Sequence, residues 1–204
     1  MVNGNPVKSP ALPIKEQDVV TLDGLILIPP SPRYLMLHKP MGYVCATRDS
    51  VHPTVIDLIE LPNKHSLQIA GRLDIDTTGL VLLTDDGQWN HRVTAPNSQC
   101  VKCYVCETAD PIAPEAVELF AAGVQLHGEK NLTRPAHLEL IGEKMARIQI
   151  HEGKYHQVKR MFAAIGNRIV RLHRESIGAI TLDSNLNPGD HRPLTPAEIK
   201  SVMP

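Results

Sequence analysis

The strongest constraint on the fold is a series of short segments, apolar or alternating, that seldom alternate one-for-one with helix signals. Segments of this length and pattern predict β-strands. The expected strands are Tyr34–Lys39, Gly42–Ala46, Leu67–Ala70, Leu80–Thr84, Tyr104–Thr108, His137–Ile141, Ala146–His151 and Arg168–His173. Because no regular strand–helix–strand order is present, we expect an α+β fold with a mixed, largely antiparallel sheet and flanking helices.

Helix signals are fewer than strand signals. The expected helices are Gln88–Val93, Pro114–Ala122, Tyr155–Ile165 and one that opens at Thr195. The last begins with the residue order of a capping box, since Pro196 and then Glu198 follow Thr195. Asp85 and Asp86 come directly before the first helix and are interpreted as turn or cap residues.

Residues 1–30 differ from the rest of the chain. Turn signals at Asn3-Gly4 and Asp23-Gly24 predict hairpins, and therefore a small β appendage. Three prolines at 29, 30 and 32 interrupt both helix and strand pairing, as a linker does. We therefore expect the main domain over residues 33–204.

Composition excludes several classes of protein. The 204 residues contain no apolar run approaching the roughly 20 residues of a membrane helix, and the first ten residues lack an apolar signal region. We therefore expect no membrane partner and a cytoplasmic location. The 21 Lys and Arg nearly balance the 22 Asp and Glu, so the net charge of −1 indicates no acidic or basic partner.

Three cysteines are spaced as they are in some metal-binding proteins. Cys100, Cys103 and Cys106 form a C-x-x-C-x-x-C run, to which distant Cys45 could add a fourth ligand. The run lies in an expected strand, where Cys103 would point to the opposite face from the other two. We therefore expect no metal site and interpret the cysteines as reduced structural thiols.

The most unusual stretch is residues 70–87, where carboxylates flank an apolar strand. Asp74 precedes a Thr-Thr-Gly turn that would hold it at a fixed point, and a carboxylate held there can act as nucleophile or electrostatic stabiliser. The segment from Asp74 to Thr78 also matches the D-x-D-x-T motif of magnesium phosphatases of the haloacid-dehalogenase class. In that class the apolar strand precedes the motif, whereas here it follows, so the phosphatase is the less favoured hypothesis.

A basic stretch without acids runs from Lys154 to Arg174. Its cations are Lys154, Lys159, Arg160, Arg168, Arg171 and Arg174. A solvated helix face is the simplest interpretation of such a run. The charges continue onto both faces of an expected strand, however, and this favours contacts with nucleic-acid phosphates. Aromatic residues make up only 3% of the chain, so stacking on many bases is not expected.

Several blocks together resemble the pseudouridine synthases. GRLD (71–74) with DTTG (76–79) and the apolar strand is similar to the central motif of that family. Other blocks resemble the family in the same order over nearly all of residues 33–203: LHKPMGYVC (37–45), VKCYV (101–105) and residues 152–178. DDGQWNHR (85–92) and GDHRPLTPAEI (189–199) point to the RsuA type, which modifies one uridine of small-subunit (16S) ribosomal RNA.

The resemblance implies roles for individual residues. Asp74 would be the catalytic aspartate, Tyr104 the active-site tyrosine against the uracil, and Lys159 the basic partner of Asp74. Leu172 would contact the base from below. Arg72 would fill the gap left by a flipped uridine or hold a phosphate, unless it forms a salt bridge to a neighbouring aspartate. The remaining cations would line the RNA path: Lys154, Arg160, Arg168, Arg171 and Arg174.

The reaction implied is an isomerisation that retains the uracil and oxidises nothing. The bond from N1 to C1′ breaks and C5 joins C1′, so no cofactor or metal is needed. Whether the aspartate bonds to the sugar, bonds to the base or only moves a proton stays open. A non-catalytic RNA-binding factor for ribosome assembly is the competing hypothesis on the same fold.

The resemblance also bears on the start of the chain. Members of the family begin with a small αL-type RNA-binding domain, in which two helices precede a β portion. Residues 2–24 resemble only that β portion. Residues 1–30 are therefore interpreted as the remnant of an N-terminally truncated domain, in a monomer that acts on ribosomal RNA or an assembly intermediate.

Overall fold

The computed structural model describes residues 1–15, 17–27, 31–95 and 100–202. The contacts group into two units, Met1–Pro32 and Arg33–Pro204, here called the N-terminal unit and the main unit. Pro29 and Pro30 of the expected linker lie outside the described residues. In the part that the structure describes, no helix is long and apolar enough to cross a membrane.

The N-terminal unit contains both hairpin turns expected from the sequence. Strands β1 (Thr21–Leu22) and β2 (Leu25–Ile26) pair across Asp23 and Gly24, whose φ angles are 50° and 83°. Asn3 and Gly4 reverse the chain in the same way, with φ angles of 50° and 80°. Two successive positive φ angles are what a tight two-residue hairpin turn requires, and Asn-Gly and Asp-Gly adopt them readily.

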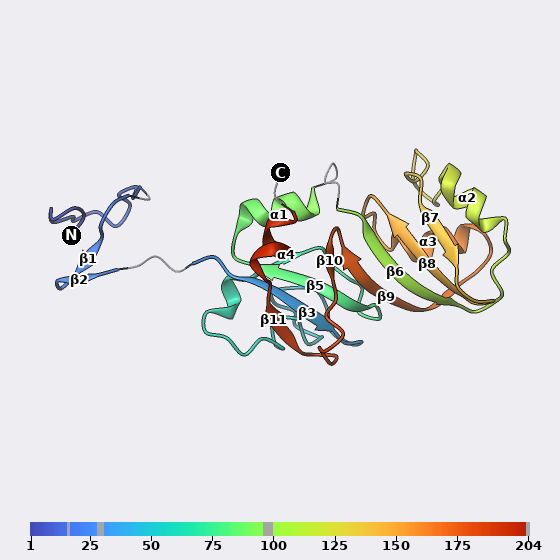
Figure 1. Cartoon of the computed structure of the whole chain (residues 1–204), viewed down its shortest axis with the longest axis horizontal. Coiled ribbons are helices and arrows are strands. Elements are labelled where there is room, and N and C mark those ends of the chain that lie inside the picture. The colour runs from blue at the N-terminus through green and yellow to red at the C-terminus, as the bar shows by residue number, and fades with distance from the viewer. Residues whose placement is uncertain (16, 28–30, 96–99, 203–204) are drawn as a thin grey trace. The chain divides into compact units, whose positions relative to one another are not determined.

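The main unit is built on a mixed sheet (Figure 1). Its strands are β3 (Tyr34–Lys39), β4 (Gln68–Ala70), β5 (Thr78–Thr84), β6 (Lys102–Thr108), β7 (His137–Leu140), β8 (Met145–Ile150), β9 (Ile169–Ile177), β10 (Ile180–Thr181) and β11 (His191–Pro193). The described residues form the order β11-β3-β5-β9-β6-β8-β7, with β4 beside β5 and β10 beside β9. The pair β5 and β9 is parallel, and the other strand pairs of this part are antiparallel, which confirms the expected α+β class.

Helices cover both faces of the sheet. The helices are α1 (Gly87–Thr94), α2 (Ala116–Ala122), α3 (Gln157–Ala164) and α4 (Pro196–Lys200), and a 3₁₀ turn spans Lys64–Ser66. Helices α2 and α3 pack on one face, called the α3 face, where Val81 and Leu83 of β5 also point. Helices α1 and α4 pack on the other, which Leu80 and Leu82 of β5 share. Because the middle of β5 is buried on both faces, its residues 80–83 form an unbroken apolar run.

The helix caps follow the sequence closely. Thr195 and Glu198 form the expected capping box at α4. Asp86 caps α1 by accepting hydrogen bonds from the backbone N–H groups of Gln88 and Trp89. Asp85 instead accepts hydrogen bonds from the backbone N and Nε of Arg33, at 2.6 and 2.8 Å.

One expected strand is absent from the described residues. Gly42–Ala46 forms only an isolated bridge between Val44 and Thr54. The segment packs instead over the loop that precedes β5, where Gly42 donates its backbone N–H to the Ile75 carbonyl at 2.8 Å. Its backbone hydrogen bonds are therefore divided between residues 53–55 and the turn before β5, and no continuous strand pairing forms.

Cys103 and Cys106 of the C-x-x-C-x-x-C run lie on opposite faces, as strand alternation predicts. Cys100 precedes β6 and packs against the core of the face that α1 and α4 cover, so the expectation that it shares a face with Cys106 is wrong. Cys106 points into the core of the α3 face. Cys103, on the opposite face of β6, lies with its Sγ 3.8 Å from a carboxylate oxygen of Glu175. Cys45 accepts a hydrogen bond from the backbone N of Leu73 at 3.2 Å.

Gly79 makes the parallel pairing of β5 with β9 possible. Its φ is +107°, and a Cβ there would lie 2.3 Å from the carbonyl oxygen of Arg174 on β9. We expect Gly79→Ala to lower the free energy of unfolding by about 2–4 kcal/mol in urea titration, since strain and overlap add. The control is Gly87→Ala at the start of α1, where a Cβ meets nothing and stability should hold or rise slightly. An unchanged midpoint for Gly79→Ala would contradict the close approach.

Candidate active site

The site lies where one edge of β5 changes its pairing partner. On that edge β5 pairs with β9 through Thr78 and Gly79, and with β4 through residues 82–84. Strand β3 occupies the other edge along its whole length. Residues 71–77, which join β4 to β5, therefore lie beside a split in the sheet.

The guanidinium of Arg174 fills this split. Its Nε donates to the carbonyl of Leu80 at 2.8 Å and Nη2 donates to the carbonyl of Gly71 at 2.7 Å. Nη1 reaches the carbonyl of Arg72 and the hydroxyl of Tyr104, both at 3.4 Å. Arg174 is 2% exposed and uses its donors within the protein, although it lines the cleft, so its expected place on the RNA path stays a prediction. Its donors satisfy backbone carbonyls that would otherwise be buried without partners.

A second buried cation holds the turn that carries Asp74. The backbone N of Thr77 donates to the carbonyl of Asp74 at 3.1 Å, which closes the turn. Lys39, fully buried at the end of β3, donates from Nζ to the carbonyls of Thr77, Pro40 and Ile75 at 2.7, 3.0 and 3.2 Å. Burial lowers the pKa of the Lys39 ammonium below its usual value.

Two basic side chains from the start of α3 face Asp74. Lys159 Nζ lies 3.3 Å from Asp74 Oδ2, and His156 Nε2 lies 3.4 Å from Asp74 Oδ1. The pair Asp74 and Lys159 is thus brought together as expected. Lys159 also contacts Asp76 at 2.5 Å. Burial raises the pKa of Asp76, but the hydrogen bond and charge of Lys159 outweigh it, so the pKa is lowered.

His156 was not among the expected site residues. It precedes α3 in the left-handed conformation, with φ 47° and ψ 36°, and its ring stacks on Tyr155 at 3.8 Å between centroids. The sequence could have indicated His156 by its position at the start of an expected helix within the basic stretch. Lys39 was missed as well, although it shares the buried side of β3 with Leu35 and Leu37.

These groups surround a cleft of about 1170 Å³. Asp74, Lys159 and His156 lie along it, and buried Tyr104 of β6 and Leu172 of β9 line it from the sheet. The cleft therefore combines an apolar, partly aromatic floor with a carboxylate held between two basic groups. Such a carboxylate can attack a bound molecule or stabilise positive charge that develops on it.

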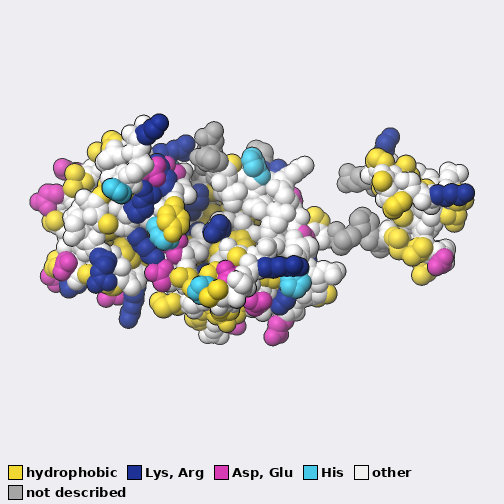
Figure 2. All heavy atoms as spheres, turned by 180° about the vertical axis from the view of Figure 1, so that it is seen from behind, with side chains coloured by type: hydrophobic (Ala, Val, Ile, Leu, Met, Phe, Trp, Pro, Cys, Tyr) yellow, Lys and Arg dark blue, Asp and Glu magenta, His cyan; other side chains and the backbone are white. Residues whose placement is uncertain are grey.

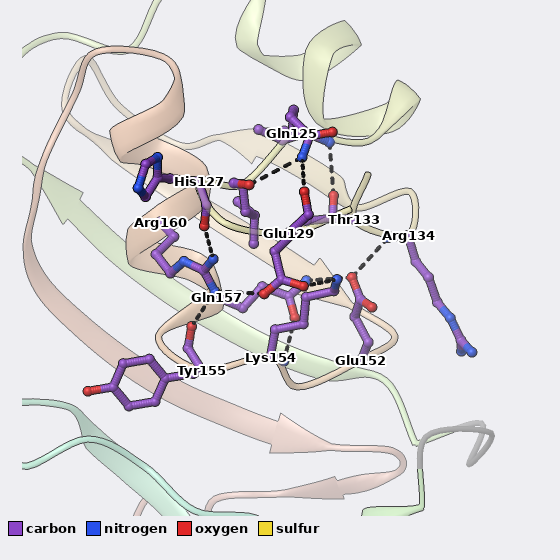
Figure 3. A network of polar contacts seen from close by, with 12 residues as sticks. Gln125, His127, Glu129, Thr133, Arg134, Glu152, Lys154, Tyr155, Gln157 and Arg160 are labelled. Carbon is purple, nitrogen blue, oxygen red and sulfur yellow. Dashed lines mark hydrogen bonds and ion pairs between the residues drawn. The ribbon is translucent and has the colours of Figure 1, made fainter. Parts of the chain in front are cut away.

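The other expected RNA-binding cations differ in their surroundings. Lys154 and Arg160 both bind Glu129, at 2.9 and 3.2 Å, and Arg160 also donates to the His127 carbonyl (Figure 3). They are therefore tied into the protein rather than open along a path. Figure 2 shows that Lys and Arg side chains alternate with Asp and Glu on one face of the molecule.

Three expected cations are exposed. Arg168 and Arg171 are exposed but do not line the cleft, and Arg171 Nε lies 3.5 Å from a carboxylate oxygen of Glu107. Arg72 is exposed at the cleft beside Asp74. It forms no ion pair with any residue that the structure describes, so the alternative of a structural salt bridge is not realised there.

Known proteins are similar to this chain in sequence and in fold. Residues 33–164 match the family described as RNA pseudouridylate synthase. The chain is 55% identical to "Ribosomal small subunit pseudouridine synthase A" of Salmonella typhimurium over 98% of its length and 87% of the relative's. It is 54% identical to the protein of the same name from Escherichia coli K12, over 99% and 88%.

Solved structures agree. One described as "Crystal structure of pseudouridylate synthase" superposes with a TM-score of 0.82 at 45% identity, covering 100% of this chain and 88% of that one. The archaeal box H/ACA Nop10–Cbf5 complex, at 14% identity and a TM-score of 0.51, shares the fold alone.

The fold, the cleft and these relatives define an isomerase that modifies RNA. The chain belongs to the RNA pseudouridylate synthase family, and within it to the RsuA type, as its motifs indicate.

The buried position of Arg174 is testable with a matched pair of variants. We expect Arg174→Met to lower the free energy of unfolding by about 2–4 kcal/mol, because it leaves the carbonyls of Leu80 and Gly71 unpaired. Arg168→Met, which removes an exposed arginine of the same basic stretch, should change it by less than about 0.5 kcal/mol. Urea unfolding followed by circular dichroism measures both. Equal stability of the two variants would contradict a structural role for Arg174.

Proposed function

We propose that this protein converts a specific uridine of small-subunit ribosomal RNA to pseudouridine, and that Asp74 is the catalytic aspartate. The names of its relatives support the choice of RNA. The observation that carries the mechanism is the position of Asp74 between Lys159 and His156, beside a floor made by Tyr104 and Leu172.

The chemistry needs a flat apolar floor and an anion beside it. The uracil ring packs on Tyr104 and Leu172, which hold it by surface contact and allow it to turn. Asp74 then faces the ribose, where it attacks or stabilises positive charge as the bond from N1 to C1′ breaks, as carboxylates do in glycoside hydrolysis. C5 bonds to C1′, the proton on C5 leaves, and N1 gains a proton. Nothing is oxidised, and the proton that N1 gains balances the one that C5 loses, so the step needs no cofactor or metal.

Lys159 and His156 support Asp74 in this role. Two basic groups within 3.4 Å stabilise its negative charge in a partly buried cleft. Lys159 shares its ammonium with Asp76, which fixes the ammonium from the solvent side. The carboxylate is therefore held in place before substrate arrives, which is what electrostatic catalysis requires.

The RNA must present its uridine outside a helix to reach this cleft. Exposed Arg72, next to the Asp74 turn, fills the gap or holds a phosphate at the cleft. Arg168 and Arg171 contact phosphates further out. Lys154 and Arg160 contribute by holding the loop before α3, and Arg174 by holding the floor. We propose a monomer in the cytoplasm, with the N-terminal unit as the β portion of an RNA-binding domain.

Loss of tritium from C5 tests the proposal. With small-subunit ribosomal RNA carrying 5-tritiated uridine, we expect release at one site and a fall of at least about 100-fold in Asp74→Asn, since the reacting carboxylate is lost. Asp110→Asn, an exposed carboxylate outside the cleft, is the control and should match the wild type. Release by Asp74→Asn at the wild-type rate would refute the role of Asp74. Tight binding without release by the wild type would favour the non-catalytic factor.

A second measurement addresses metal dependence. With RNA folded in monovalent salt, we expect tritium release to keep its rate in excess EDTA, because the isomerisation draws on side chains alone. A magnesium phosphatase would lose its activity under these conditions. A loss in EDTA that magnesium restores, while the RNA stays folded, would count against the mechanism.

A further inference from the structure

Tyr155 is the exposed aromatic residue of this protein. All seven Phe, Trp and Tyr side chains lie in the described part of the chain, and the other six are buried or half-buried. Tyr155 is 76% exposed and lines the same cleft as Asp74. A single exposed apolar side chain is ordinary on a protein surface. Its place at the mouth of a catalytic cleft is what calls for an explanation.

One face of the Tyr155 ring is already covered. The ring stacks on His156 at 3.8 Å with an angle of 21° between the planes, and His156 Nε2 in turn lies 3.4 Å from Asp74. High exposure leaves the opposite face of the ring open. Figure 3 shows the ring pointing away from the polar network that holds its loop. We call this stacked pair the tyrosine platform.

The platform is held by a dense set of contacts behind it (Figure 3). Arg160 donates to the carbonyl of Tyr155 at 3.1 Å and binds Glu129, which also binds Lys154. Gln157 accepts a hydrogen bond from the Lys154 backbone N and donates to Glu152, both at 2.9 Å. The loop is thus ordered before any ligand binds, which reduces the entropy lost on binding.

The backbone of the platform is itself constrained. His156 adopts the left-handed conformation, which is uncommon for a residue other than glycine. Such conformations persist where the surrounding contacts over-determine them, and they cluster at binding and catalytic sites. The strain is therefore a second sign, independent of exposure, that the position of this pair matters.

We propose that the tyrosine platform stacks against an unpaired base of the RNA, next to the target uridine. Only the imidazole of His156 separates Tyr155 from Asp74, so a base on the platform belongs to a nucleotide adjacent to the one at Asp74. Single-stranded RNA is commonly held by stacking on aromatic rings. Every base offers a π-face, so the platform fixes the position of the neighbour without reading its identity. This subsite rests on the proposed function.

Substitutions separate stacking from other roles of Tyr155. With a short RNA that contains the target uridine, we expect Tyr155→Ala to lower kcat/KM for tritium release about 10-fold, since stacking on one base is worth that much or more. Tyr155→Phe and Tyr155→Trp should stay within about 3-fold of wild type, because they keep the ring. Leu119→Ala, an exposed apolar residue of α2, is the matched control for a surface truncation and should have no effect.

Removing the base tests the contact directly. When the nucleotide that stacks is replaced by an abasic one, wild type and Tyr155→Ala should react equally, whereas an abasic nucleotide elsewhere should preserve their difference. Equal kcat/KM for Tyr155→Ala and wild type on the intact RNA would overturn the proposal. A difference that persists with every abasic RNA, or that appears only on assembled particles with ribosomal proteins, would also overturn it.

Fluorescence distinguishes failure of the subsite from failure of the proposed function. In Asp74→Asn with Tyr155→Trp, the new indole is exposed while Trp89 is fully buried, so quenching on addition of RNA reports the platform. We expect quenching by the intact RNA and little by the abasic one. Quenching with no tritium release by the wild type would refute the proposed function alone, and release without quenching would refute the subsite alone.

Discussion

The hydrogen bonds of the Arg174 guanidinium are the interaction on which the rest of the site depends. Strand β5 pairs with β9 over two residues and then with β4, so the carbonyl of Leu80 in β5 and that of Gly71 in the loop after β4 face a gap. The planar fork of an arginine reaches Leu80, Gly71 and Tyr104 at once, which a lysine could not do. The loop that ends at Asp74 and the tyrosine of the floor therefore share one support.

Much of the positive charge near the cleft maintains structure. Lys39 and Arg174 bind carbonyls inside the fold, and Lys154 and Arg160 bind Glu129. Among the described residues, Arg72 is exposed at the cleft without an ion pair, whereas Lys159 is engaged by Asp74 and Asp76. This division is consistent with a net charge of −1, since the local excess of cations in the sequence is largely neutralised by the protein itself.

The sequence pattern predicted helix caps and tight turns well, because these features depend on interactions between residues that are close in sequence. The capping box at Thr195, the cap at Asp86 and the Asp23-Gly24 turn each depend on residues within a few positions. Long-range pairs were harder. Asp74 and Lys159 were joined only through resemblance to a family. The contacts of Arg174 with backbone carbonyls were not predicted, because its charge was given more weight than its place on the same strand face as buried Leu172. The left-handed backbone of His156 leaves no mark in composition.

The ion pairs of Glu129 link the segment from Lys154 to Arg160 to a part of the chain remote from it in sequence. Glu129 lies between α2 and β7, yet it anchors both Lys154 and Arg160 on either side of the tyrosine platform. Changes of length or sequence around residues 124–134 would therefore shift the segment from Lys154 to Arg160, which carries the platform. Under the proposed function, such changes would alter how an RNA is positioned without replacing Asp74 or Lys159.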